Sequence, residues 1–244
     1  MPAVTDMPRV CLTFLFRITL IIFFLAPVSE AQAQLTNNGN DDVYGFDPML
    51  YNGRYYTFFS PLNARGNQFL NDRQFESGTV TLRGRTYSDL SLNYDIYNQQ
   101  LLLKYSEDQG ITKVIIISDA WLESFSIEDR NFRILQVSEN EKRICQKIGT
   151  GRTSILYFWK KSMQVTNVVD GTTMSFSKPS REMNLLIKGK IVRYRNNRSF
   201  INLFESEDKE NIRKYFRTHR INVKNSSDRI IEDLITYCNT FNEK

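Results

Sequence analysis

The sequence predicts an α+β fold that is mostly β: an antiparallel meander sheet, curved or barrel-like, with a C-terminal helical pair. Three observations support this prediction. Short β-prone runs follow one another along most of the chain, turn-forming residues separate them, and a helical spacing of apolar residues takes over only after Arg195. Hydrophobic residues make up 41% of the 244 residues, which is enough apolar material for a folded core.

Residues 1–33 are predicted to form a cleavable secretory signal peptide. Arg9 and Arg17 supply a positive n-region, an apolar run follows them, and Ala31-Gln32-Ala33 matches a small-residue cleavage site. An uncleaved membrane anchor would need about 18 uninterrupted apolar residues, whereas a charge interrupts this stretch. We therefore expect an exported protein, periplasmic or associated with the cell surface, that has no transmembrane segment after signal cleavage. The polar residues 34–42 are expected to form a flexible lead-in.

An antiparallel β domain is expected over residues 43–196. In its first hairpin, Asn52-Gly53 joins residues 49–51 to residues 54–59, because this dipeptide tolerates positive φ at both central positions of a type I′ turn. A meander follows, and its turns are too short to hold crossover helices. Its β-prone runs lie at residues 79–82, 90–96, 101–105, 114–118, 121–127 and 132–137.

Val114 to Ile117 is apolar on both faces, which predicts a central strand. The second half of the domain continues the antiparallel pattern less regularly. Its expected strands lie at residues 155–159, 173–177, 183–187 and 191–195, and Lys188-Gly189-Lys190 joins the last two.

Residues 197–244 are expected to form helices packed on the same domain. The stretch 205–220 begins with acidic residues and ends with basic ones, which suits the dipole of a single helix. A last helix is expected to start at the N-cap Ser227, with Asp228 in its first turn. Its apolar stripe should dock on the sheet and comprises Ile230, Ile231, Leu234, Ile235, Cys238 and Phe241.

Charge and composition narrow the classes of function. The chain has 32 basic and 27 acidic residues and a net charge of +5, and the two signs interleave, so no nucleic-acid partner is expected. With His219 as the single histidine, a His-based zinc site cannot be assembled. Residues 149–154 lack the Lys-Ser/Thr ending of a phosphate loop and precede a strand-like run, so a turn between strands is expected. We predict no catalytic residue, no cofactor site and no metal site.

Two cysteines and three carboxylates remain as open questions. In an oxidising compartment Cys145 and Cys238 could form a disulfide, which would stabilise the fold by about 4 to 5 kcal/mol in the chain-entropy model. The alternative is two free, buried thiols. Acid/base chemistry would need two positioned carboxylates, and the candidates are Asp47, Asp95 and Asp119. Turn-forming or solvated carboxylates are the default expectation.

An aromatic set near the start of the β domain is the main candidate for a partner-binding face. The set is denser than a half-buried hairpin requires, and amphipathic aromatic side chains suit contacts with a glycan, a peptide or a partner protein. Packing within the sheet is the alternative, since strands favour these residue types. The set comprises Tyr44, Phe46, Tyr51, Tyr55, Tyr56, Phe58 and Phe59.

Several segments together resemble a group of exported Gram-negative envelope proteins without an assigned activity. They are residues 50–56 (LYNGRYY), 66–70 (GNQFL), 78–87 (GTVTLRGRTY) and 92–97 (LNYDIY), followed by the helical tail. The shared features are strand and turn residues and include no catalytic signature. The resemblance therefore implies export and a β-rich body, and it transfers no functional residue.

Three functions are compatible with these expectations. The first is a non-enzymatic binding or structural module of the cell envelope, with an envelope protein, a glycan or a lipid as its partner. The second is a carrier of an apolar ligand, because a curved antiparallel sheet can enclose a cavity. The third is a carboxylate-dependent hydrolase of envelope polymers, which the absence of a catalytic motif makes the least favoured.

Overall fold

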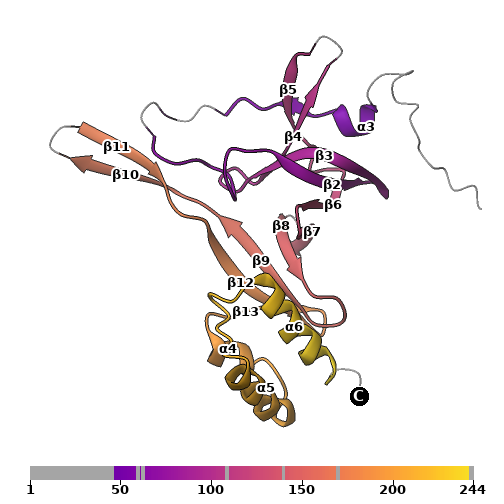
Figure 1. The fold of residues 1–244 in the computed structure, drawn as a ribbon, viewed down its shortest axis with the longest axis vertical. Coiled ribbons are helices and arrows are strands. Elements are labelled where there is room, and N and C mark those ends of the chain that lie inside the picture. The colour runs from indigo at the N-terminus through magenta and orange to yellow at the C-terminus, as the bar shows by residue number, and fades with distance from the viewer. Residues whose placement is uncertain are drawn as a thin grey trace, which may run out of the picture. The chain divides into compact units, whose positions relative to one another are not determined.

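One antiparallel sheet of 11 strands dominates the fold (Figure 1). The computed structural model describes residues 47–58, 61, 64–107, 110–138, 141–168 and 171–241. The strand order in the sheet is β1-β5-β4-β3-β2-β6-β7-β8-β9-β12-β13. The strands are β1 (Arg54–Tyr55), β2 (Glu76–Leu82), β3 (Arg85–Asp95), β4 (Gln100–Ser106), β5 (Thr112–Ile116), β6 (Leu122–Ile127), β7 (Arg130–Ser138), β8 (Glu141–Ile148), β9 (Ser154–Lys160), β12 (Ser180–Ile187) and β13 (Lys190–Arg193).

The predicted fold class is confirmed, with a sheet that stays open. All neighbouring strands pair antiparallel, and the edge strands β1 and β13 do not pair with each other. A separate hairpin, β10 (Met163–Val168) and β11 (Gly171–Phe176), is inserted between β9 and β12. The helices are the single turn α3 (Pro48–Tyr51), the short α4 (Asn197–Ile201) and the predicted pair α5 (Ser206–Thr218) and α6 (Asp228–Asn239).

Two tight turns have the backbone geometry that their hairpins require. Arg83 and Gly84, between β2 and β3, have φ values of +48° and +79°, and Lys188 and Gly189, between β12 and β13, have +49° and +72°. Positive φ at both central positions is the signature of a type I′ turn, whose twist matches the flanking strands.

The predicted hairpin at Asn52-Gly53 is wrong. Pro48 stands at the start of a helical turn, and the backbone N–H of Met49 donates to Asp47 Oδ1 at 2.8 Å, so residues 48–51 form α3. Gly53 is needed for a different reason, since a side chain there would collide with the carbonyl oxygen of Ile116 on β5. The glycine therefore allows β1 to approach β5.

The predicted central position of Val114 to Ile117 is also wrong. Val114 to Ile116 lie in β5 and Ile117 follows it. β5 is next to the edge of the sheet and pairs on its outer side with the two residues of β1. From the sequence, no strand is predicted at β8 or at β10. β8 alternates charged and apolar residues irregularly, and β10 has three polar and three apolar residues without a sustained alternation, so neither shows a clear β pattern.

The described core consists of two main hydrophobic clusters. The sheet cluster is formed by strands β2 to β8 with α3, and the helix cluster by β8, β9 and β12 with α4, α5, α6 and Tyr194, which follows β13. Strand β8 belongs to both, because Ile144 lies in the sheet cluster and Ile148 in the helix cluster. Trp159 of β9 packs against both clusters as well. The helices therefore share a core with the sheet.

Helix α6 docks through most of its predicted stripe. Its buried residues are Ile231, Leu234, Ile235 and Cys238, whereas Ile230, predicted on the same side, is 40% exposed. Ser227 is the N-cap residue, although its side chain makes no capping hydrogen bond. Helix α5 has Glu207 and Asp208 in its first turn and Arg217 in its last, as its dipole favours.

Candidate functional site

The predicted aromatic face is divided among different environments. Tyr44, Phe46 and Phe59 lie outside the described residues. Tyr51 packs edge to face on Tyr105 with ring centroids 4.8 Å apart, whereas Tyr55 is 59% exposed. The other two members, Tyr56 and Phe58, are half-buried and lie beside each other, and Phe58 also contacts Tyr97 and Phe176.

Tyr56 belongs to a hydrogen-bonded group around the fully buried Asp95. Its hydroxyl donates to Asp95 Oδ2 at 2.7 Å and accepts from Gln68 Nε2 at 2.9 Å. The carboxylate also accepts from the backbone N–H groups of Tyr97 and Asn98 and from Asn98 Nδ2. Burial, followed by the hydrogen bond to Asp95, raises the pKa of Tyr56. This arrangement holds the chain after β1 against the β3–β4 turn and is structural.

The three candidate carboxylates are held by different sets of partners. Asp47 caps α3 and pairs with Arg85, and Asp95 organises the β3–β4 turn. Asp119 is exposed in the turn between β5 and β6. Within the described ranges, no group of three or more His, Cys, Asp or Glu side chains could hold a metal ion.

Both cysteines are free and buried in the structure. Cys145 of β8 contacts Leu156 and Phe158, whereas Cys238 of α6 belongs to the helix cluster. Burial raises the pKa of each thiol from 9.0 to about 12.

The segment 149–154 contains a turn between β8 and β9, as predicted; the turn spans residues 149–153 and β9 begins at Ser154. Asn239 of α6 forms hydrogen bonds with the backbone of this turn. Thr153 N–H donates to Asn239 Oδ1 at 2.9 Å, and Asn239 Nδ2 donates to the carbonyl oxygens of Thr150 and Thr153 at 2.8 and 3.1 Å. His219 is the exposed C-cap residue of α5, and its ring lies 4.1 Å from that of Tyr215.

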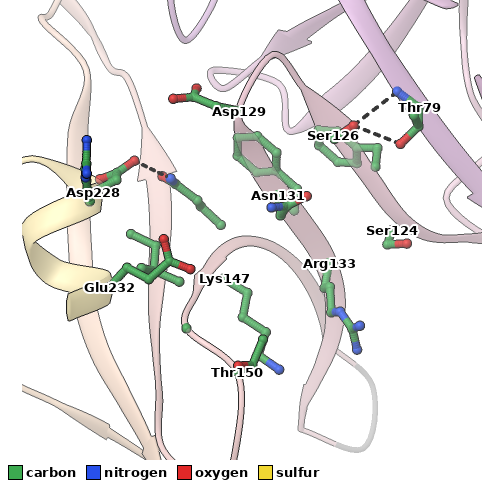
Figure 2. A pocket seen from close by; sticks show the side chains of 16 residues that line it. Thr79, Ser124, Ser126, Asp129, Asn131, Arg133, Lys147, Thr150, Asp228 and Glu232 are labelled. Carbon is green, nitrogen blue, oxygen red and sulfur yellow. Dashed lines mark hydrogen bonds between the residues drawn. The ribbon is translucent and has the colours of Figure 1, made fainter. Parts of the chain in front are cut away.

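A groove of about 570 Å³ is a further candidate site, and sequence reasoning did not find it. Figure 2 shows side chains from β2, β6, β7 and β8 on one side and from the first turns of α6 on the other. We call it the polar groove. Its polar lining comprises Thr79, Ser124, Ser126, Asp129, Asn131, Arg133, Gln146, Lys147, Thr150, Asp228, Arg229 and Glu232.

Strand register builds the floor of the polar groove. Thr79 pairs with Ser126, and Ser126 pairs with Asn131, so three polar side chains form a row across β2, β6 and β7. Thr79 and Ser126 also share a hydrogen bond of 2.8 Å between their hydroxyl oxygens. In a neighbouring row, Ser124 pairs with Arg133. Positions two apart on a strand share a face, so both rows line the same face.

The wall formed by α6 is fixed by a hydrogen-bonded chain. Trp159 Nε1 donates to Gln146 Oε1 at 2.8 Å, and Gln146 Nε2 donates to Asp228 Oδ2 at 2.6 Å. Arg181 approaches Asp228 at 3.6 Å and stacks over the ring of Tyr157, with 3.9 Å from Cζ to the ring centroid. The buried Gln146 therefore ties the first turn of α6 to the sheet at the place where the two clusters meet.

The polar groove carries charges of both signs. Arg133, Lys147 and Arg229 line it together with Asp129 and Glu232, and none of these five forms an ion pair with another residue that the structure describes. Four of these residues are exposed and Lys147 is half-buried, so their charges remain available to a ligand with charged groups of its own.

No known protein family matches this chain, and no curated protein or solved structure is significantly similar to it. Among the described residues, no helix is long and apolar enough to cross a bilayer.

Proposed function

We propose that the protein is an exported, non-enzymatic binding module of the cell envelope that holds a charged glycan in the polar groove. The observation that carries this proposal is the groove floor, in which strand register aligns the hydroxyl and amide groups of Thr79, Ser126 and Asn131. Export follows from the predicted signal peptide at residues 1–33, and sequencing the N-terminus of the secreted chain tests it.

A polar ligand fits this groove better than an apolar one. An apolar ligand would remove the groups of the floor from water without replacing their hydrogen bonds, at a cost of roughly 1 to 3 kcal/mol for each group. A glycan offers both donors and acceptors on every sugar ring. Amino and carboxyl substituents on the glycan would meet the unpaired Asp129, Glu232, Arg133 and Lys147.

Binding of soluble peptidoglycan fragments to the purified protein tests the proposal. Calorimetry should detect binding by the natural chain and a Kd about tenfold higher for each of Asn131→Ala and Arg133→Ala, because each removes hydrogen-bonding groups from the floor. Lys142→Ala is the matched control, since Lys142 is exposed at the start of β8 and does not line the groove. Equal Kd values for all four proteins would contradict the glycan site.

The same fragments test for a hydrolase. The carboxylates that line the groove are Asp129, Asp228 and Glu232, and none of the carboxylates considered from the sequence is among them. If the natural chain produced new reducing ends and Glu232→Gln did not, the result would contradict a binding module and would indicate a hydrolase. The proposal expects no turnover in either protein.

The carrier hypothesis would use a second cavity of about 510 Å³. Its apolar lining consists of the half-buried Ile116 and of Leu101, Ile117, Leu122 and Ile144, which are each at most 7% exposed. Little apolar surface is therefore open to a ligand, which favours the polar groove. Native mass spectrometry of envelope-purified protein separates the two, because a stoichiometric lipid adduct would favour the carrier.

A further inference from the structure

The hairpin β10–β11 has an unpaired outer edge. β10 pairs with β11 in continuous register from Met163↔Phe176 to Val168↔Gly171. The other side of β11 is partly occupied, because Arg65 N–H donates to the Met174 carbonyl oxygen and Phe176 N–H donates to the Arg65 carbonyl oxygen, both at 2.9 Å. β10 has no partner on its other side among the described strands.

This edge lacks the protection that the other edges of the fold possess. β1 is two residues long, and β13 is four residues long with exposed Lys190 and Arg193. Short strands and charged side chains discourage the addition of a further strand. β10 is six residues long, contains neither a charged residue nor a proline, and has no bulge in its register.

The hairpin is also poorly covered. Gln164, Val165 and Thr166 are all exposed, and Val165 is 60% exposed. Since successive side chains of a strand point to opposite faces, neither face of β10 is covered here. A two-stranded ribbon is only marginally stable in water, whereas three or more strands can be stable. An added strand would therefore stabilise this hairpin.

We propose that β10 pairs antiparallel with β10 of a second copy of this chain. The product is a four-stranded sheet across a twofold axis, with the two β10 strands in the middle. A twofold axis brings the same edge of both copies together, so a charged edge would repel itself. The uncharged β10 is free of this repulsion, so its edge is compatible with the same edge of a second copy. The inference is independent of the polar groove.

Analytical ultracentrifugation of the full secreted protein tests the dimer. The natural chain should sediment with twice the mass of one chain. Val165→Lys places a like charge on both edges at the middle of the strand and should raise the dimer Kd about tenfold or more. Val165→Thr, which keeps an uncharged β-branched side chain, should remain dimeric. Ile191→Lys, on the 39% exposed Ile191 of β13, is the matched charge control and should also remain dimeric.

A natural chain that stays monomeric up to about 100 μM, well above a micromolar Kd, would overturn the proposal. A dimer with unchanged Kd in Val165→Lys would also overturn it. Circular dichroism confirms that each variant is folded. A monomer whose β10 amides become protected from hydrogen exchange only after another envelope protein is added would assign the edge to that protein instead.

Discussion

Gly149, in the β8–β9 turn, combines two requirements that only glycine meets. Its φ is +84°, and a Cβ atom there would lie 2.5 Å from Ile235 Cγ2 of α6. Gly189, in the β12–β13 turn, has a similar φ of +72° with nothing within 4 Å of the added atom. A substitution at Gly189 therefore measures backbone strain alone, whereas one at Gly149 measures strain together with a steric collision.

Gly149→Ala is expected to lower the free energy of unfolding by about 2 to 4 kcal/mol, because left-handed strain and overpacking against Ile235 add. Gly189→Ala should cost about 1 to 2 kcal/mol, from strain alone. Urea unfolding of both variants measures the difference. Equal losses would mean that α6 does not pack on the turn as described.

The two buried thiols make a pH-dependent contribution to stability. Burial raises the pKa of Cys145 and Cys238 from 9.0 to about 12. Above pH 9 the unfolded chain loses thiol protons that the folded chain keeps, so the free energy of unfolding falls as pH rises. The contribution is fully present below pH 9.

Between pH 9 and pH 10 the natural chain is expected to lose about 1 kcal/mol for each thiol. A double Cys145→Ala, Cys238→Ala variant should lose less across the same interval, whatever its stability at pH 7. Urea unfolding at the two pH values measures both slopes. Buried tyrosines whose pKa is also raised, such as Tyr157, add their own loss above pH 10. Identical slopes in the two proteins would show that the thiols are accessible.

At the scale of elements, local patterns predict most of the strands, and tertiary contacts decide the exceptions. The alternation of Leu92, Tyr94 and Ile96 with polar residues predicts the end of β3, although the structure buries the polar Asn93 and Asp95 as well. Residues 49–51 have equally apolar side chains, but the cap at Asp47 and the proline that follows it turn them into a helix. The neighbouring β1 forms because β5 pairs with it, and the two strands are far apart in the chain.

The polar groove escaped prediction for the same reason. Each side chain of its floor belongs to a predicted strand or turn, but the row exists only because β2 pairs with β6, about 47 residues away in the chain. The polar face of the last helix indicates a solvent-facing surface and does not show which strands it approaches. A comparison of the polar positions in the predicted strands 79–82 and 121–127 would have indicated the groove floor, because polar residues on the two strands fall on the same face.

Tyr56 tests how the segment after β1 is held. Tyr56→Phe removes the donor to Asp95 and leaves Gln68 Nε2 without its acceptor, so we expect a loss of roughly 1 to 3 kcal/mol in the free energy of unfolding. Tyr55→Phe, at the exposed neighbouring position, should change it by about 0.5 kcal/mol or less. Urea denaturation compares the two. If Tyr56→Phe left the free energy of unfolding unchanged, the apolar contacts of this segment, and not its hydrogen bonds, would hold it in place.

At the scale of the whole molecule, the two hydrophobic clusters are joined by continuous structure. β8 contributes Ile144 to one cluster and Ile148 to the other, and Gln146 between them connects Trp159 with Asp228. Residues 46–244 form one compact unit. Because an element common to both clusters cannot unfold in one and stay folded in the other, the clusters should lose structure together.

The two tryptophans allow this coupling to be measured. Trp121 packs against the sheet cluster, whereas Trp159 packs against both clusters. In Trp159→Phe the fluorescence reports the sheet cluster, and in Trp121→Phe it reports the junction. Each variant should show a single urea transition that coincides with its own transition in far-UV circular dichroism, where the helices dominate. A helical signal that is lost at a lower urea concentration than the Trp121 signal would mean that the helix cluster unfolds independently, and that β8 transmits no cooperativity between the clusters.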